Sequence, residues 1–131
     1  MFNLSQTSRG RFLECDEKLQ SIVKELLKTF NVTVLQYGGH RSLQVQQMLF
    51  EAGKSKVVYP NSKHNSEPSR AVDIAPYPVD WDDLYRFYYM AGEVFRIAHF
   101  KGINIRWGGD WNGNKDFSDQ NFNDLPHFEL L

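Results

Sequence analysis

Residues 62–75, SKHNSEPSRAVDIA, pass from a polar loop into a short apolar run. The run AVDIA is apolar and partly β-branched except for Asp73, which predicts a short buried strand that carries one acid. The preceding residues 55–69 are polar and proline-containing, and long loops of this kind in compact domains tend to carry function. The stretch therefore places His64 on a loop and Asp73 on a strand a few residues later.

Helices and further strands are predicted on both sides of this stretch, from cap residues and apolar periodicity. The inward-facing residues expected for the longest helix are Leu84, Phe87, Tyr88, Ala91, Val94, Phe95 and Ala98. The expected helix boundaries are Ser5 or Thr7 for the first start, Asp16 for the second, Ser42 and Gly53 for the third helix, and Asp80 and Gly102 for the longest. The other expected strands are VTVLQYG after Asn31, INIRW and the terminal HFELL. These elements predict an α+β fold with a small, largely antiparallel sheet and helices packed against it.

Length and charge exclude several classes of protein. With 131 residues, 41% of them hydrophobic, the chain suffices for one domain with a core, residues 1–131, and is too short for two. A net charge of -1 is not that of a nucleic-acid or anionic-membrane binder, and no apolar stretch approaches the roughly 20 residues of a membrane span. The N-terminus lacks the apolar core of a signal peptide, so we expect synthesis in the cytoplasm. The single Cys15 excludes an internal disulfide, and we expect a monomer.

Two histidines lie near carboxylates at short spacing: His64 with Asp73, and His127 with Asp124. A loop histidine, a strand aspartate and a histidine on the last strand could converge on one Zn²⁺ and leave a fourth position open, as catalytic zinc requires. Asp124 precedes His127 by three residues and could then serve as general base. The alternative is that Asp73 is a strand-end acid and Asp124 a turn former in FNDLP.

Several motifs resemble those of the zinc D-Ala-D-Ala carboxypeptidase and L-alanyl-D-glutamate endopeptidase family, which includes phage endolysins. They are SKH at 62–64, AVD at 71–73, the strand-to-helix segment that begins GGHRS at 38–42, RWGGDW at 106–111 and DLPHFEL at 124–130. The resemblance covers nearly the whole chain and implies a D-Ala-D-Ala carboxypeptidase-like fold with a zinc site at the sheet. It also implies His64, Asp73 and His127 as zinc ligands, Asp124 as the base, and Arg41 as the group that stabilises the oxyanion.

The sequence departs from the family in one place. Nine positions separate His64 from Asp73 where the family usually has seven, and we interpret the extra residues as an enlarged loop because added loop length costs little closure entropy. Ser62 could orient His64 or the substrate, or could simply cap the loop. Trp107 could line the substrate groove together with Trp111, or could pack in the core from its strand.

The resemblance implies a hydrolase that acts on the peptide of bacterial peptidoglycan, with no nucleic-acid or stable membrane partner. An L-alanyl-D-glutamate endopeptidase is favoured over a D-Ala-D-Ala carboxypeptidase, because the short chain and the Asp of the last motif are similar to phage endolysins. A catalytically inactive, zinc-containing wall-binding module is the alternative of a different class. For a phage lysis enzyme without a signal peptide, we expect action on the cell wall after release from the host cytoplasm by a separate protein.

A second ion is a weaker hypothesis. Oxygen-bearing side chains alternate as in the first half of a calcium-binding loop, at Asp110, Asn112, Asn114 and Asp116. Lys115 stands where such loops need Gly, and Asn121 stands where a bidentate Glu would close the site. Any affinity for Ca²⁺ should therefore be weak, and a solvated, turn-rich loop is the favoured interpretation.

Overall fold

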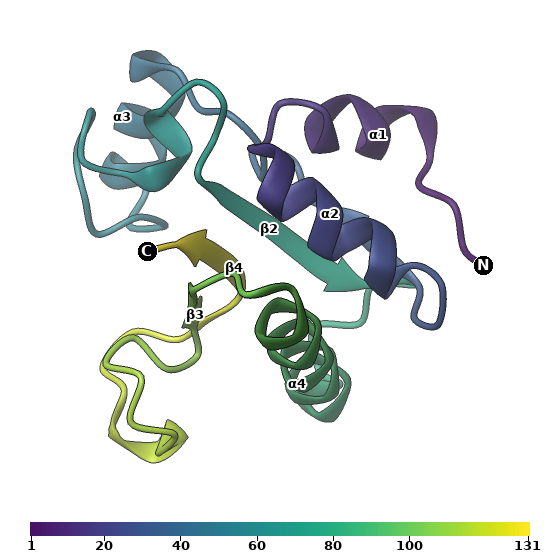
Figure 1. The fold of residues 1–131 in the computed structure, drawn as a ribbon. Coiled ribbons are helices and arrows are strands. Elements are labelled where there is room, and N and C mark those ends of the chain that lie inside the picture. Colours follow the sequence, from purple (N-terminus) through teal and green to yellow (C-terminus); the bar gives the residue numbers. More distant parts are fainter.

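The computed structural model describes residues 1–131 as four α-helices, two 3₁₀ turns and one four-stranded sheet (Figure 1). The elements in chain order are α1 (Gln6–Phe12), α2 (Glu17–Leu26), β1 (Val32–Val34), α3 (Leu43–Glu51), η1 (Lys63–Asn65), β2 (Ala71–Pro76), α4 (Leu84–Lys101), β3 (Ile105–Gly108), η2 (Phe117–Asp119) and β4 (Asp124–Leu130). None of the helices combines the length and the apolar character needed to cross a membrane.

The sheet has the strand order β1-β2-β4-β3, and every neighbouring pair is antiparallel. The two central strands therefore come from the middle and the end of the chain. Their register sets Asp73 of β2 directly opposite His127 of β4. The predicted α+β fold with a small antiparallel sheet is confirmed, and two residues of the predicted site are cross-strand neighbours in it.

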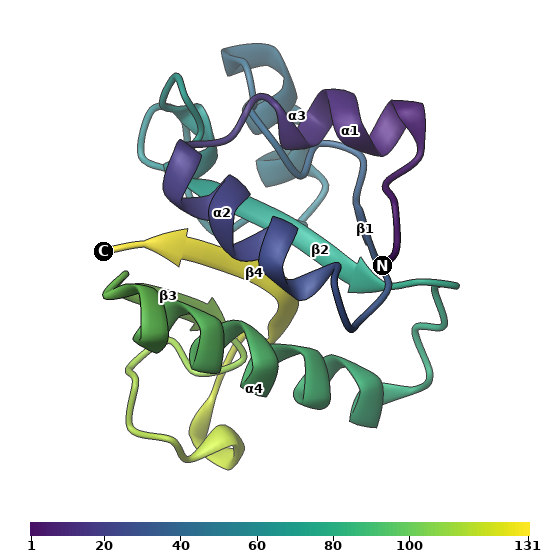
Figure 2. The same ribbon diagram turned by 45° about the vertical axis from the view of Figure 1, so that its right-hand side comes forward.

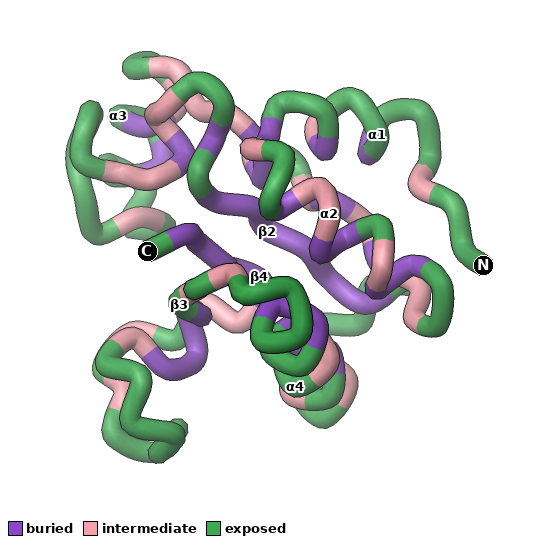
Figure 3. Tube along the Cα trace, viewed as in Figure 1, coloured by how far each residue is buried: buried purple, intermediate pink, exposed green.

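Helices α2 and α4 cover one face of the sheet (Figure 2). Val72 of β2 and Phe128 of β4 belong to the hydrophobic core that these helices help to form. Because successive strand residues point to opposite faces, Asp73, His127 and Glu129 point to the other face. Both central strands are buried along most of their length (Figure 3), so the polar face of the sheet is enclosed as well.

Three predicted helix starts are confirmed by their hydrogen bonds. Ser5, Asp16 and Ser42 are the N-cap residues of α1, α2 and α3, and the side chain of each accepts a bond from a backbone N–H in the first turn. These bonds satisfy donors that have no partner within the helix. The predicted end of α4 at Gly102 is confirmed too, since this residue has a left-handed conformation with φ of 70°.

The predicted start of α4 is wrong. The helix begins at Leu84, and Asp80 instead accepts a hydrogen bond from the backbone N–H of Asp82 in a turn that precedes it. Leu84 and Phe95 are 50% and 38% exposed rather than inward-facing. The buried stripe starts one turn later and runs at helical spacing through Phe87, Met90, Ala91, Val94, Ile97 and Ala98.

Candidate metal centre and cleft

Three side chains from distant parts of the chain converge on the polar face of the sheet. His64 comes from η1, Asp73 from β2 and His127 from β4, and one ligand atom from each lies within 4.8 Å of the others. The Nε2 atom of His64 and the Nδ1 atom of His127 are each 3.1 Å from Oδ1 of Asp73. All three residues are buried, so the predicted set of ligands forms one enclosed cluster.

The outer nitrogen of each imidazole is held by an acceptor. His64 Nδ1 lies 2.7 Å from the carbonyl oxygen of Gly39, and His127 Nε2 lies 2.8 Å from Oε1 of Glu129. An acceptor at these positions requires the ring proton there, which leaves a lone pair on the inner nitrogen of each neutral ring. When both rings are neutral, two imidazole lone pairs and a carboxylate oxygen face one another, and this donor set fits a zinc ion with one position left open.

The charges of the cluster respond to this arrangement. Burial disfavours ionisation of Asp73, but His64 and His127 outweigh it and hold the pKa of this carboxyl well below its ordinary value. Burial opposes the charged form of His127, while its hydrogen bonds to Asp73 and Glu129 raise its pKa to about 9. Without a metal, a proton on His127 therefore occupies the space between the ligands at neutral pH.

Asp124 begins β4 and lines a cleft of about 480 Å³ together with His64 and His127. Burial, with the nearby charge of Asp73, raises the pKa of Asp124 to about 6. A carboxylate with a pKa in this range can take and return a proton near neutral pH. Gly108 of β3 allows β4 to approach here, because a Cβ at this position would overlap the carbonyl oxygen of Asp124.

Arg41 lies in the same cleft and contacts two parts of the centre. Its Nη2 donates to Oδ2 of Asp73 at 2.9 Å, and its Nε donates to the carbonyl oxygen of Tyr37 at 2.8 Å. Its backbone N–H donates to the carbonyl oxygen of His64. The Nη1 group has no protein partner, so the guanidinium is fixed in place and still has donors available to a ligand in the cleft.

Ser62 acts on the backbone rather than on the imidazole ring. Its Oγ accepts from the backbone N–H of His64, and Asn65 returns a bond to the backbone N–H of Ser62, which forms a capping box. The partner predicted for the His64 ring is instead Gly39. Of the two alternatives for Ser62, the structure therefore confirms that it caps the loop.

The enlarged loop between His64 and Asp73 is held by Ser66. The hydroxyl of Ser66 lies 2.9 Å from the carbonyl oxygen of Pro68 and accepts from the backbone N–H of Arg70. The extra residues thus form a local turn, and they do not separate His64 from Asp73.

Of the two alternatives for Trp107, core packing is confirmed and a place in the groove is wrong. Trp107 is 1% exposed and donates its indole N–H to the carbonyl oxygen of Leu125, because its position on β3 directs it to the helix-covered face opposite Phe128. Trp111, four residues later, lines the cleft, and its ring centroid lies 5.2 Å from that of His127.

Two cleft residues were not singled out by the sequence. Glu129 holds the His127 ring, and Arg106 of β3 lies opposite Glu129 in the register. The signal that could have found Glu129 is the strand period of two, which puts residues 127 and 129 on one face.

The polar loop between β3 and β4 is built of turns. Asn112, Asn114 and Asp116 each accept a hydrogen bond from the backbone N–H two residues later, and Asp110 accepts from the backbone N–H of Lys115. These bonds are typical of the turn-rich loop that the sequence favours. Weak Ca²⁺ binding by this loop stays a prediction.

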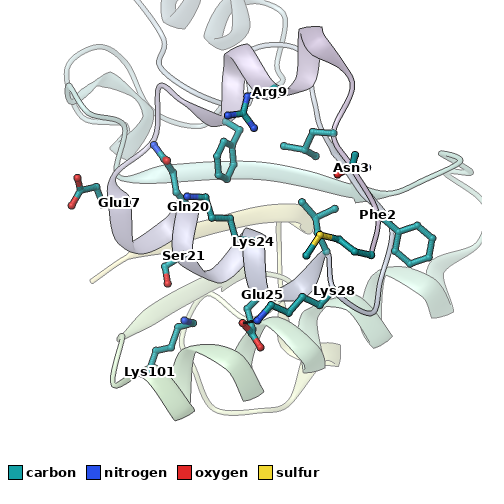
Figure 4. Close-up of a pocket in the computed structure, with 14 residues that line it drawn as sticks. Phe2, Asn3, Arg9, Glu17, Gln20, Ser21, Lys24, Glu25, Lys28 and Lys101 are labelled. Carbon is teal, nitrogen blue, oxygen red and sulfur yellow. Dashed lines mark ion pairs between the residues drawn. The ribbon is translucent and has the colours of Figure 1, made fainter.

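A larger hollow, of about 830 Å³, is lined by none of the three cluster residues (Figure 4). It is bordered by residues 1–4, α1, α2 and Lys101, and contains the exposed ion pair of Glu25 with Lys28. It contains no histidine, and its charged lining consists of four cationic side chains and two carboxylates. The cleft at the metal cluster is therefore the candidate site despite its smaller volume.

Comparisons with known proteins agree with this geometry. The family model described as phage L-alanyl-D-glutamate peptidase matches residues 1–131. The L-alanyl-D-glutamate peptidase of Escherichia phage T5 is 27% identical over 125 residues, which cover 91% of this chain and 88% of that protein. The crystal structure of the Serratia marcescens L-Ala D-Glu endopeptidase ChiX superposes with a TM-score of 0.75 at 26% identity and covers 98% of this chain and 90% of that one. The chain belongs to the phage L-alanyl-D-glutamate peptidase family.

Proposed function

We propose that this chain is a zinc-dependent endopeptidase of peptidoglycan that hydrolyses the amide bond between L-alanine and D-glutamate in the stem peptide. The observation that carries the proposal is the convergence of two imidazole nitrogens and one carboxylate oxygen beside Asp124, in a chain whose whole length matches this peptidase family. In this proposal the 131 residues act as one catalytic domain, a phage endolysin that reaches the cell wall after release.

His64, Asp73 and His127 would hold the metal. Bound zinc supplies a Lewis acid that lowers the pKa of a coordinated water to about 7. Asp124 accepts a proton from the attacking water and returns it to the nitrogen of the leaving amine. Its position in the cleft, beside His64 and His127, suits both steps.

Arg41 stabilises the negative charge that develops on the carbonyl oxygen as the amide is attacked. Its contacts with Asp73 and Tyr37 hold the guanidinium in advance, so no reorganisation is needed when the charge forms. The donors of its Nη1 group remain for the substrate.

Two other functions compete with this one. A D-Ala-D-Ala carboxypeptidase would use the same centre, but the family and both relatives above are L-alanyl-D-glutamate peptidases. An inactive, zinc-containing wall-binding module would need neither a general base nor an oxyanion donor. The position of Asp124 and Arg41 in the cleft favours an enzyme.

The test is incubation of zinc-loaded protein with purified peptidoglycan, followed by identification of the new termini. The proposed endopeptidase exposes the amino group of glutamate and the carboxyl group of alanine. A D-Ala-D-Ala carboxypeptidase releases free D-alanine instead. Binding to peptidoglycan with neither product would establish the inactive module, and Asp124→Asn serves as the matched inactive control.

A further inference from the structure

The cleft at the metal centre is more basic than the molecule as a whole. Its lining includes five cationic side chains, those of Arg41, Lys54, Lys56, Lys63 and Arg106, and two carboxylates, those of Asp124 and Glu129. The chain overall has a net charge of -1. Positive charge is thus concentrated where a substrate binds, which favours an anionic ligand.

Most of these cations already have a contact within the protein. Arg41 is paired with Asp73, and the ammonium group of Lys63 donates to the carbonyl oxygen of Leu130 at 3.0 Å. The ammonium group of Lys56 lies 5.2 Å from the ring centroid of Phe122, which also lines the cleft. The ammonium group of Lys54 has no hydrogen bond or ion pair, but Lys54 lies on an exposed loop.

Arg106 is different because its guanidinium is placed by a strand and remains available. It forms no hydrogen bond within the protein, and its one ionic contact is Nη1 at 3.9 Å from Oε2 of Glu129. This distance is too long for a hydrogen bond, and the side chain is 45% exposed. The planar, two-pronged donor set of arginine matches a carboxylate.

The position of Arg106 relative to the metal centre is fixed by the sheet. Arg106 of β3 lies opposite Glu129 of β4, and Glu129 holds the ring of His127. Arg106 is therefore one side chain removed from a predicted metal ligand and lies on the same face of the sheet. Arg106 also lines the same cleft as His64 and His127, so a peptide bound in this cleft lies beside both the cluster and this side chain.

The chemistry of the proposed substrate supplies a matching group. A D-glutamate whose amine is in the scissile amide still has two carboxyl groups, of which one continues the peptide and the other is free. We propose that Arg106 binds this free carboxylate and thereby makes the enzyme specific for glutamate in its acidic form. The inference rests on the proposed function and adds to it the residue, Arg106, that selects the glutamate of the leaving group.

The experiment compares two synthetic stem peptides that differ only in this group, one with the free carboxylate and one with a carboxamide. Zinc-loaded protein is expected to cleave the carboxylate peptide with a kcat/KM about 10- to 100-fold higher, the range of a hydrogen-bonded charge. Arg106→Ala should raise KM for the carboxylate peptide, leave kcat nearly unchanged and abolish the preference. Arg106→Lys, which keeps the charge but not the two-pronged geometry, should be intermediate.

Arg96→Ala is the matched control, because Arg96 is exposed on α4 and pairs with Glu93 outside the cleft. The zinc affinity of Arg106→Ala shows which role Arg106 has. If Arg106 binds the substrate, the zinc affinity stays unchanged. If Arg106 instead supports Glu129, the zinc affinity weakens. Equal cleavage of both peptides by the unmodified protein, or weakened zinc binding with no change in preference, overturns the role of Arg106. Cleavage of neither peptide at the alanine–glutamate bond overturns the proposed function itself.

Discussion

The Nε2 atom of His64 and the Nδ1 atom of His127 lie 3.3 Å apart, so the two rings present different nitrogens to the same point. Each ring is fixed by its outer nitrogen, His64 by the Gly39 carbonyl and His127 by Glu129. The space between the inner nitrogens must hold a cation or a proton, because two lone pairs beside a carboxylate repel one another. The predictions below follow from this competition and from the groups around it.

Zinc binding should release a proton. Burial opposes the charged form of His127, but its hydrogen bonds to Asp73 and Glu129 raise its pKa to about 9 in the metal-free protein, and it must lose its proton to bind a metal, so at least about one proton is released per zinc at pH 7.5. Calorimetry in buffers of different ionisation enthalpy measures this proton release.

The same protein should lose peptidoglycan hydrolysis on treatment with a chelator and regain it when zinc is added back. Full activity after verified metal removal would end the zinc assignment.

Asp124→Asn should lower kcat by roughly two to four orders of magnitude while stoichiometric zinc is retained, because an amide cannot accept the proton. Metal content by mass spectrometry and rates on peptidoglycan give the two readouts. Asp82→Asn, which alters an exposed carboxylate, is the control. Loss of zinc from Asp124→Asn would instead identify Asp124 as a ligand.

The same substitution should stabilise the metal-free protein at neutral pH. Folding raises the pKa of Asp124 from 3.8 to about 6, so the stability that this carboxyl contributes is fully present below pH 3.8 and is lost as the pH rises through 6. Asp124→Asn removes the resulting penalty, which is on the order of 1–3 kcal/mol above pH 6. Thermal unfolding at pH 7.5 and pH 4 tests this. The gain in melting temperature should be present at the higher pH and nearly absent at the lower.

Glu129→Ala should weaken zinc binding by about 10- to 100-fold, because His127 loses the partner that fixes its ring and raises its basicity. Glu129→Gln should have a smaller effect, since its amide oxygen can still accept the ring N–H. Competition with a chromogenic chelator measures the affinity, and Glu93→Gln on α4 is the control. Unchanged affinity in Glu129→Ala would mean that the rest of the cluster suffices to orient His127.

Arg41→Ala should lower kcat by about 10²- to 10³-fold, the effect of removing a donor to the oxyanion. Zinc should still bind stoichiometrically, because all three predicted ligands remain. Arg86→Ala is the control, since this arginine donates to the carbonyl oxygens of Tyr77 and Pro78 after β2 and does not line the cleft. Near-normal turnover of Arg41→Ala would mean that Arg41 does not stabilise the oxyanion and only forms its ion pair with Asp73.

The sequence predicts the fold well wherever local signals decide the structure. Ser5, Asp16 and Ser42 are found as caps because each precedes an apolar periodic segment, and a cap is a local hydrogen bond. The start of α4 is missed because Asp80 and Asp83 are both acceptable before a helix. The choice between them depends on where the helix meets the sheet, which is tertiary information.

In the candidate site, too, local motifs are predicted from the sequence and tertiary arrangements are not. The motifs around His64, Asp73, His127 and Asp124 indicate which residues meet, and the structure brings them together. The assignment of Trp107 and the omission of Glu129 both arise because alternation gives two faces to a strand but does not say which face is covered by helices. Which face is covered depends on how α2 and α4 pack against the sheet, and the sequence of a strand does not contain this information.

The direct pairing of Asp73 with His127 across the central strands has a consequence for how this enzyme can diversify. The candidate centre is built on the two buried central strands, whereas the walls of the cleft around Lys54 and Trp111 are surface loops. Those loops can change in length and composition while the hydrolytic machinery stays in place. Selection for a new host wall can therefore act on one part of the chain without the risk of losing catalysis in the other.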